Sequence, residues 1–138
     1  MREIRFRAWY EEEKEMQSVI DIYFNKNKGD IESFVTKGKK ATYHTDVHTH
    51  KLMQYTGSKD KNGVEIYEGD IIHFKHNQMA GLGFVYFNEE VAQWWIKDIR
   101  EVTKKRGQRY YPFWKDCQYR IDGNIYENPE LLETKKSS

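Results

Sequence analysis

The most metal-like group of side chains lies in the segment ATYHTDVHTH, residues 41–50. If this segment is a β-strand, its alternation places His44, Asp46, His48 and His50 on one face. Imidazole nitrogens and a carboxylate oxygen are ligands that zinc accepts. Same-face residues lie roughly 6.5–7 Å apart, so only two or three of them could reach one ion. The alternative is a polar stripe that faces solvent, and we predict neither a bound metal nor another cofactor.

Carboxylates crowd the middle of the chain, at Asp60, Glu65, Glu68 and Asp70. Paired acids can serve as general acid and base, or can hold a hard cation. Turns explain the same residues, because Asp caps turns and Glu faces solvent. Cys117 is the single cysteine, which excludes an intrachain disulfide, and KDCQY around it is no known nucleophile motif. We therefore predict no catalytic residue.

The clearest charge bias lies in residues 98–114, DIREVTKKRGQRYYPFW. Its cations, the candidate nucleic-acid contacts, are Arg100, Lys104, Lys105, Arg106 and Arg109. Its rings follow at once, at Tyr110, Tyr111, Phe113 and Trp114. Cations beside rings suit single-stranded nucleic acid, through phosphate contacts and base stacking. The preferred interpretation is an exposed lysine-rich loop that leads into a strand whose rings serve the core.

The composition of the whole chain limits its function class. Its 138 residues suit one domain, and 38% hydrophobic with 15% aromatic residues can form a core. The 23 basic and 22 acidic residues nearly cancel, so the net charge of +1 gives no overall footprint for nucleic acid or an anionic membrane. No apolar run has the length of a signal peptide or a membrane span, so we expect a cytoplasmic protein.

Short strands and turns must position these side chains. Alternation and β-branched residues predict strands over residues 4–9, 19–24, 31–36, 41–50, 52–56, 64–67, 71–74, 84–87, 91–97 and 118–122. Asn62 and Gly63 fit a tight hairpin turn, and residues 76–83 read as a flexible loop. Asn128 as N-cap and Pro129 at the first helical position predict a short C-terminal helix.

We therefore expect a mainly β protein that forms a single domain over residues 1–138. A β-meander covers residues 1–50, and a small SH3-like barrel or strongly bent antiparallel sheet covers residues 51–122. The C-terminal helix and tail cover residues 123–138.

Three blocks of the sequence resemble a known family. They are the opening REIRFRAW, the central LMQYTGSKDKNGVEIYEGDI and the closing GNIYENPELLE. In order and spacing they are similar to the YopX family of phage and prophage proteins, from the first residues to about Glu133. The His-rich segment at 44–50 and the basic loop at 103–108 depart from the pattern. The resemblance implies a mainly β phage or prophage protein in the cytoplasm of a bacterial host, and it brings no activity and no catalytic residue.

Three function classes follow. We prefer a non-enzymatic binding or assembly module that uses exposed rings and sheet edges. Its partner would be a host or phage protein, or further copies of itself in a homo-oligomer. A nucleic-acid-binding accessory protein is the first alternative, and a small metal- or carboxylate-dependent enzyme is the second. No membrane partner is expected.

Overall fold

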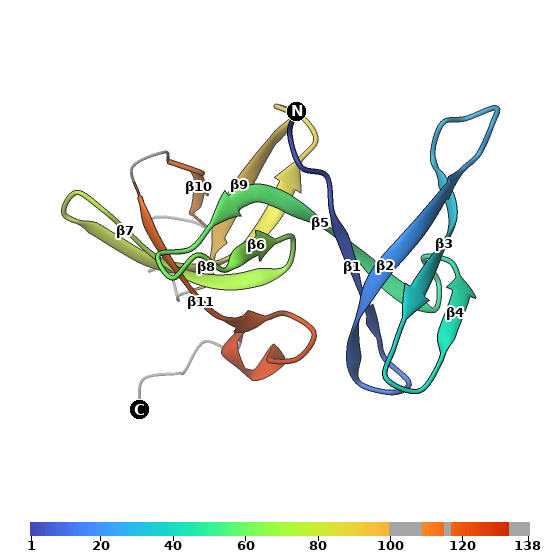
Figure 1. Ribbon diagram of the computed structural model, residues 1–138. Helices are drawn as coiled ribbons and strands as arrows, with labels where there is room; N and C mark the ends of the chain where they lie inside the picture. The colour runs from blue at the N-terminus through green and yellow to red at the C-terminus, as the bar shows by residue number, and fades with distance from the viewer. Residues whose placement is uncertain (100–108, 115–116, 133–138) are drawn as a thin grey trace. The chain divides into compact units, whose positions relative to one another are not determined.

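A computed structural model describes residues 1–99, 109–114 and 117–132, and this part of the chain is almost entirely β (Figure 1). The predicted mainly β class is confirmed. The strands form two antiparallel sheets. The chain divides into two compact units, Met1–Tyr55 and Thr56–Ser138, which are described in turn. Whether they act as one domain stays a prediction.

The first unit is built on an antiparallel meander. Its strands are β1 (Phe6–Tyr10), β2 (Glu15–Phe24), β3 (Ile31–Lys37), β4 (Thr42–Thr45) and the start of β5 (His50–Lys59). The sheet order is β4-β3-β2-β1-β5-β6, so β5 returns to pair with β1. Ala8, Phe34 and Met53 are among its buried apolar side chains.

The single strand predicted over residues 41–50 is wrong. β4 ends at Thr45, a turn follows, and β5 begins at His50. The turn depends on Asp46, whose Oδ1 accepts the His48 amide at 2.8 Å and whose carbonyl accepts the His50 amide at 3.2 Å. The local hydrogen bonds of an Asx turn therefore outweigh the β-branched composition that favoured a continuous strand.

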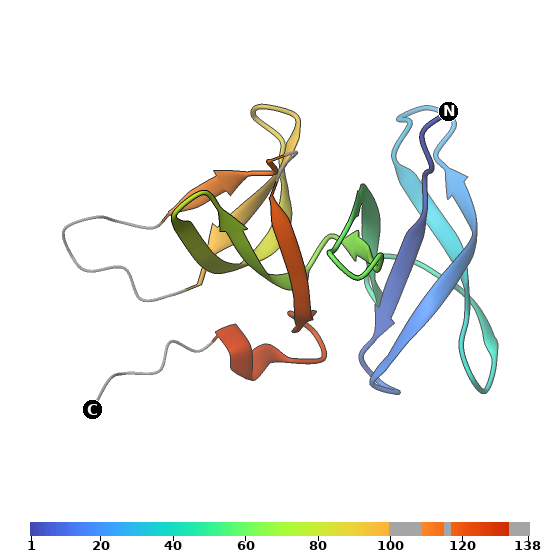
Figure 2. The same ribbon diagram turned by 60° about the vertical axis from the view of Figure 1, so that its left-hand side comes forward.

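The second unit holds a five-stranded antiparallel sheet, in the order β10-β9-β8-β7-β11 (Figures 1 and 2). Its strands are β7 (Asp70–His76), β8 (Met79–Asn88), β9 (Gln93–Asp98), β10 (Tyr110–Pro112) and β11 (Gln118–Asn124), and β6 (Glu65–Tyr67) lies beside β5. Ile66 and one face of this sheet form the core, with Ile72, Phe74, Val85, Ile96, Tyr111 and Tyr119 buried together.

The prediction of a flexible loop over residues 76–83 is wrong. β7 and β8 instead pair as far as His76 and Met79, and Asn77, with φ of 55°, makes the turn between them. Asparagine adopts such a left-handed conformation more readily than most residues. The glycines of this segment supply space, because Gly81 pairs with Phe74 and a Cβ there would overlap the Phe74 ring.

The predicted SH3-like barrel and C-terminal helix are not found. Among the strands that the structure describes, no pairing joins β10 to β11, so the sheet stays open. The expected helix is a 3₁₀ turn, η1 (Pro129–Leu132). Asn128 does not cap it with its side chain, because Oδ1 accepts the backbone amide of Asn124 at 3.2 Å.

Candidate anion-binding face

Cations and rings collect on the face of the five-stranded sheet opposite the core. Residues that pair directly across two strands share a face, so the register decides which side chains lie there. Arg120 pairs with His73, Gln118 with Lys75, Phe84 with Lys97, and Tyr86 with Trp95. Their neighbours along each strand, such as Phe74, Tyr119 and Ile96, are core residues. We refer to the opposite surface as the outer face.

A groove of about 330 Å³ lies at the β11 end of the outer face. Three positively charged side chains line it, and they come from three separate elements, namely Lys61 after β5, Lys75 on β7 and Arg120 on β11. The rest of its lining is His73, Phe74, Ala80, Gln118 and Tyr119. No carboxylate is among the described residues that line it. We refer to it as the basic groove.

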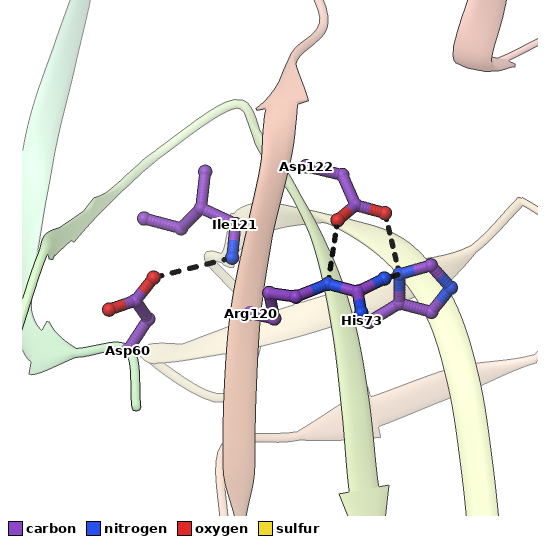
Figure 3. Close-up of polar contacts among 5 residues, drawn as sticks. All are labelled: Asp60, His73, Arg120, Ile121 and Asp122. Carbon is purple, nitrogen blue, oxygen red and sulfur yellow. Dashed lines mark hydrogen bonds and ion pairs between the residues drawn. The ribbon is translucent and has the colours of Figure 1, made fainter. Parts of the chain in front are cut away.

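Asp60 fixes the position of Lys61 at the groove. It is 8% exposed, and its Oδ1 accepts the amides of Asn62 and Val64 at 2.8 and 2.9 Å. Its Oδ2 accepts the Ile121 amide at 3.5 Å (Figure 3). The Lys61 amide then donates to the Tyr119 carbonyl at 2.8 Å. The turn therefore lies against β11 through its backbone, which leaves the Lys61 ammonium group for the groove.

Asp122 organises the cations of β7 and β11. A bulge between Ile121 and Gly123 makes Asp122 the extra residue in β11. Its Oδ1 lies 3.0 Å from Arg120 Nε, and its Oδ2 lies 2.5 Å from His73 Nδ1. Figure 3 shows the three side chains together on one side of β11. The side chains of His73 and Arg120 are 45% and 50% exposed, so both also meet solvent.

The nitrogen His73 Nδ1 has two polar neighbours. Arg120 Nη2 approaches it at 2.6 Å, on top of the contact with Asp122. A ring nitrogen has room for one hydrogen bond, and a carboxylate oxygen needs a donor. We therefore assign the Nδ1 proton to the bond with Asp122, which leaves Arg120 Nη2 as a crowded donor beside it. One carboxylate thus serves two donors.

Four rings lie farther along the outer face, beyond the fully buried Ile71, which pairs with Phe84. The members of this aromatic row are Phe84, Tyr86, Trp95 and Tyr110. Neighbouring centroids lie 6.3 Å apart between Phe84 and Tyr86 and 6.1 Å apart between Tyr86 and Tyr110. The Lys97 ammonium lies 5.8 Å from the centre of the Phe84 ring. Tyr110 is 44% exposed, so at least part of the row meets solvent.

The four candidate metal ligands of residues 41–50 do not come together. His44 lies on β4 with its Nε2 3.2 Å from Ser33 Oγ, and Asp46 and His48 belong to the turn after it. His50 is buried in the first unit, stacked on the Tyr10 ring at 4.3 Å. No group of three or more potential ligands that could hold an ion occurs among the described residues.

His50 belongs to a buried polar network. Its Nε2 lies 2.9 Å from Gln17 Oε1, which also accepts the Thr36 hydroxyl at 2.7 Å, and its Nδ1 lies 2.9 Å from Thr45 Oγ1. Burial lowers the pKa of His50, partly offset by Asp46. Both ring nitrogens are therefore already engaged, and the side chain has a structural role.

Three of the four carboxylates of the middle segment, Asp60, Glu65 and Asp70, have structural roles. Asp60 holds the turn described above, and Asp70 Oδ2 accepts the Tyr67 amide at 2.8 Å. Glu65 Oε2 accepts the Tyr67 hydroxyl at 3.1 Å. The Cys117 thiol donates to the Lys75 carbonyl at 3.2 Å, and burial raises its pKa, which is the reverse of what a nucleophilic thiol needs.

Of the five candidate nucleic-acid contacts, only Arg109 lies in the part of the chain that the structure describes. The other four lie outside it, namely Arg100, Lys104, Lys105 and Arg106. Arg109 is half-buried, and its carbonyl accepts the Asp98 amide at 2.9 Å. Tyr111, Phe113 and Trp114 join the core, as the preferred interpretation of this segment expected. Tyr110 does not, because it lies on the outer face.

Comparison with known proteins confirms the family resemblance. A model of the YopX protein family matches residues 5–133. The chain is similar to the solved structure of protein EF1440 from Enterococcus faecalis, with 25% identity and a TM-score of 0.55 over 96% of this chain and 100% of that one. It shares its fold with protein yopX from Bacillus subtilis, with 20% identity and a TM-score of 0.58 at the same coverage. None of the curated proteins matches the chain. The described residues include no helix with the length and hydropathy to cross a membrane.

Proposed function

The chain belongs to the YopX family, and from the geometry of its second unit we propose that it is a non-enzymatic binding module that holds an anionic ligand in the basic groove. The observation that carries this proposal is the convergence of Lys61, Lys75 and Arg120 from three elements on one groove.

The arrangement of these cations favours a ligand role over a structural one. Like charges on neighbouring strands lower the stability of a sheet. Asp122 offsets part of that cost for Arg120 and His73. Among the described residues, however, no carboxylate lines the groove beside Lys61 and Lys75. A bound anion would supply the missing charge and accept charge-assisted hydrogen bonds from all three elements.

The chemistry of the remaining polar groups supports binding without catalysis. Asp60 and Asp70 accept backbone amides in turns, so neither is placed as a general base. The thiol of Cys117 has a raised pKa and donates to a carbonyl. A small enzyme that depends on these groups is therefore the weaker alternative.

A polyanion titration tests the proposal. We expect inorganic polyphosphate to bind the full chain in calorimetry at low salt, and the double variant Lys75→Glu/Arg120→Glu to lose most of that binding. The matched control is Lys26→Glu/Lys28→Glu, which changes the net charge equally at exposed positions of the first unit. Circular dichroism and thermal unfolding establish that each variant folds, and Lys75→Glu alone serves if the double variant does not. Absence of binding, or equal weakening by both pairs, would overturn the proposal.

The proposal sets this binding in the cytoplasm of a bacterial host, with a phage or prophage origin, as the family resemblance implies. Assembly into a homo-oligomer stays a prediction. Light scattering at micromolar concentration is the measurement for it, and a monomer would restrict the module to partners of another kind.

A further inference from the structure

We infer that the anionic ligand is a single-stranded nucleic acid, whose phosphates occupy the basic groove while its bases stack on the aromatic row. This inference rests on the proposed function and names its ligand class. It does not depend on the cations of residues 98–114, since Tyr110 is its only contact from that segment and the others come from Lys61 and from β7, β8, β9 and β11.

The groove and the row are continuous on the outer face. His73 of the groove pairs with Leu82, and Phe84 is the next outward residue on β8. Phe84 in turn pairs with Lys97, which pairs with Tyr110 on β10. Diagonal neighbours on one sheet face lie roughly 7–8 Å apart. A chain that leaves the groove at His73 therefore meets the first ring within one residue spacing.

The rings of the outer face do not belong to the buried core cluster of the second unit. That core lies on the opposite face, where Phe74, Tyr111 and Tyr119 supply its rings. Phe84, Tyr86, Trp95 and Tyr110 thus form a second set of rings, interleaved with the Lys97 ammonium group. Cations beside rings on one sheet face match the two parts of a nucleotide, the phosphate and the base.

This combination discriminates among anionic polymers. Polyphosphate offers charge without rings, and a duplex keeps its bases stacked inside, so both can use the basic groove alone. Only a single strand presents phosphates and unstacked bases together. The face crosses five strands, from β11 to β10. Four spacings of about 4.8 Å give a path of ~19 Å, which suits a segment of a few nucleotides.

Fluorescence anisotropy with labelled oligonucleotides tests the inference. The probes are oligo(dT) and oligo(U) of about 12 nucleotides, in the size range of single-strand sites, and a duplex of equal length. We expect both single strands to bind more tightly than the duplex, and a preference between them would identify the natural polymer. The slope of log K against log salt should be near −3, at about −0.7 for each phosphate contact. The four cations that make these contacts are Lys61, Lys75, Lys97 and Arg120.

Ring and cation variants should give different responses. Tyr110→Ala should lower the affinity for single strands by roughly 5- to 150-fold, the range for loss of one stacked base, without changing the salt slope. Lys75→Ala should reduce the slope by about 0.7. The control for the ring is Tyr23→Ala in the first unit, since Tyr23 is 47% exposed and Tyr110 is 44% exposed. Tyr110→Leu separates the loss of the π face from the loss of apolar area.

The failures of the two proposals are distinguishable. If polyphosphate and the duplex bind as tightly as the single strands, and Tyr110→Ala and Tyr23→Ala behave alike, the nucleic-acid inference is wrong and the anion-binding proposal stands. If no polyanion binds, both are wrong.

Discussion

Gly81 is a position in the second unit where one added methyl group would press directly on a core ring. It pairs with Phe74, whose ring is 2% exposed and lies 4.9 Å from Tyr111 and 5.9 Å from Trp114 between ring centroids. A Cβ at residue 81 would overlap two ring carbons of Phe74 and lie 2.8 Å from Cε2. Because the ring is enclosed on its other sides, it cannot move away without disturbing the core.

The expected loss of stability for Gly81→Ala follows from two opposing effects. Overpacking a core costs about 1–3 kcal/mol. Replacing glycine lowers the entropy of the unfolded chain, which returns about 0.4–1 kcal/mol. The net loss is then about 1–2 kcal/mol, which corresponds to a fall in Tm of roughly 4–16 °C for a unit of this size.

Urea unfolding followed by tryptophan fluorescence measures this loss, since Trp94, Trp95 and Trp114 all lie in the second unit. A double-mutant cycle with Phe74→Leu isolates its cause. The leucine removes the ring that the methyl group overlaps, so Gly81→Ala should cost little or nothing in that background. If Gly81→Ala is as stable as the unchanged protein, or costs the same in both backgrounds, the packing explanation is refuted.

Three further predictions concern the polar groups. Because burial lowers the pKa of His50, the folded state binds its proton less readily than the unfolded state. The first unit should therefore keep its full stability above pH 6.5, the ordinary histidine pKa, and lose part of it as the pH falls from there toward the lowered pKa. Urea unfolding between pH 7.5 and 5 measures this loss. The variant His50→Gln should show a weaker dependence of stability on pH. Asp60→Ala leaves three backbone amides without their acceptor and should lower the free energy of unfolding by about 1–3 kcal/mol. It should also weaken polyphosphate binding, because Lys61 loses its support, whereas an unchanged affinity would remove Lys61 from the site. Partial burial raises the pKa of Cys117, so iodoacetamide should modify the folded protein more slowly than the urea-unfolded protein, and equal rates would contradict the raised pKa.

The sequence predicted most strands because alternation and turn residues are local signals. Gly63, with φ of 82°, sits in the hairpin turn predicted for it. His50 shows where local signals end. Its partner Gln17 lies 33 residues away in the chain, and no pattern around residue 50 indicates that this histidine faces inward while His44 faces outward. The metal hypothesis required a continuous strand, and one Asx turn at Asp46 removed it.

The candidate site was beyond prediction for a similar reason. Arg120 and His73 are 47 residues apart, and each looks like an ordinary polar position between apolar ones. Only the register of β7 with β11 brings them together. The Asp122 bulge adds a carboxylate to the cluster, and a bulge of one residue leaves no clear trace in composition. The bias in residues 98–114 was the stronger local signal, which is why the sequence directed attention there.

The core and the outer face of the second unit depend on the same register. Ile72 and Phe74 enter the core because their side chains alternate with His73 and Lys75, so the residues that specify the core also direct the cations outward. A slip of one residue between β7 and β11 would turn Arg120 toward the core and break the Asp122 cluster. Gly81 opposes a comparable slip between β7 and β8, because it is the position on β8 that accommodates the Phe74 ring. The glycine therefore supports the groove without touching it, and weaker polyphosphate binding by a folded Gly81→Ala protein would reveal that coupling.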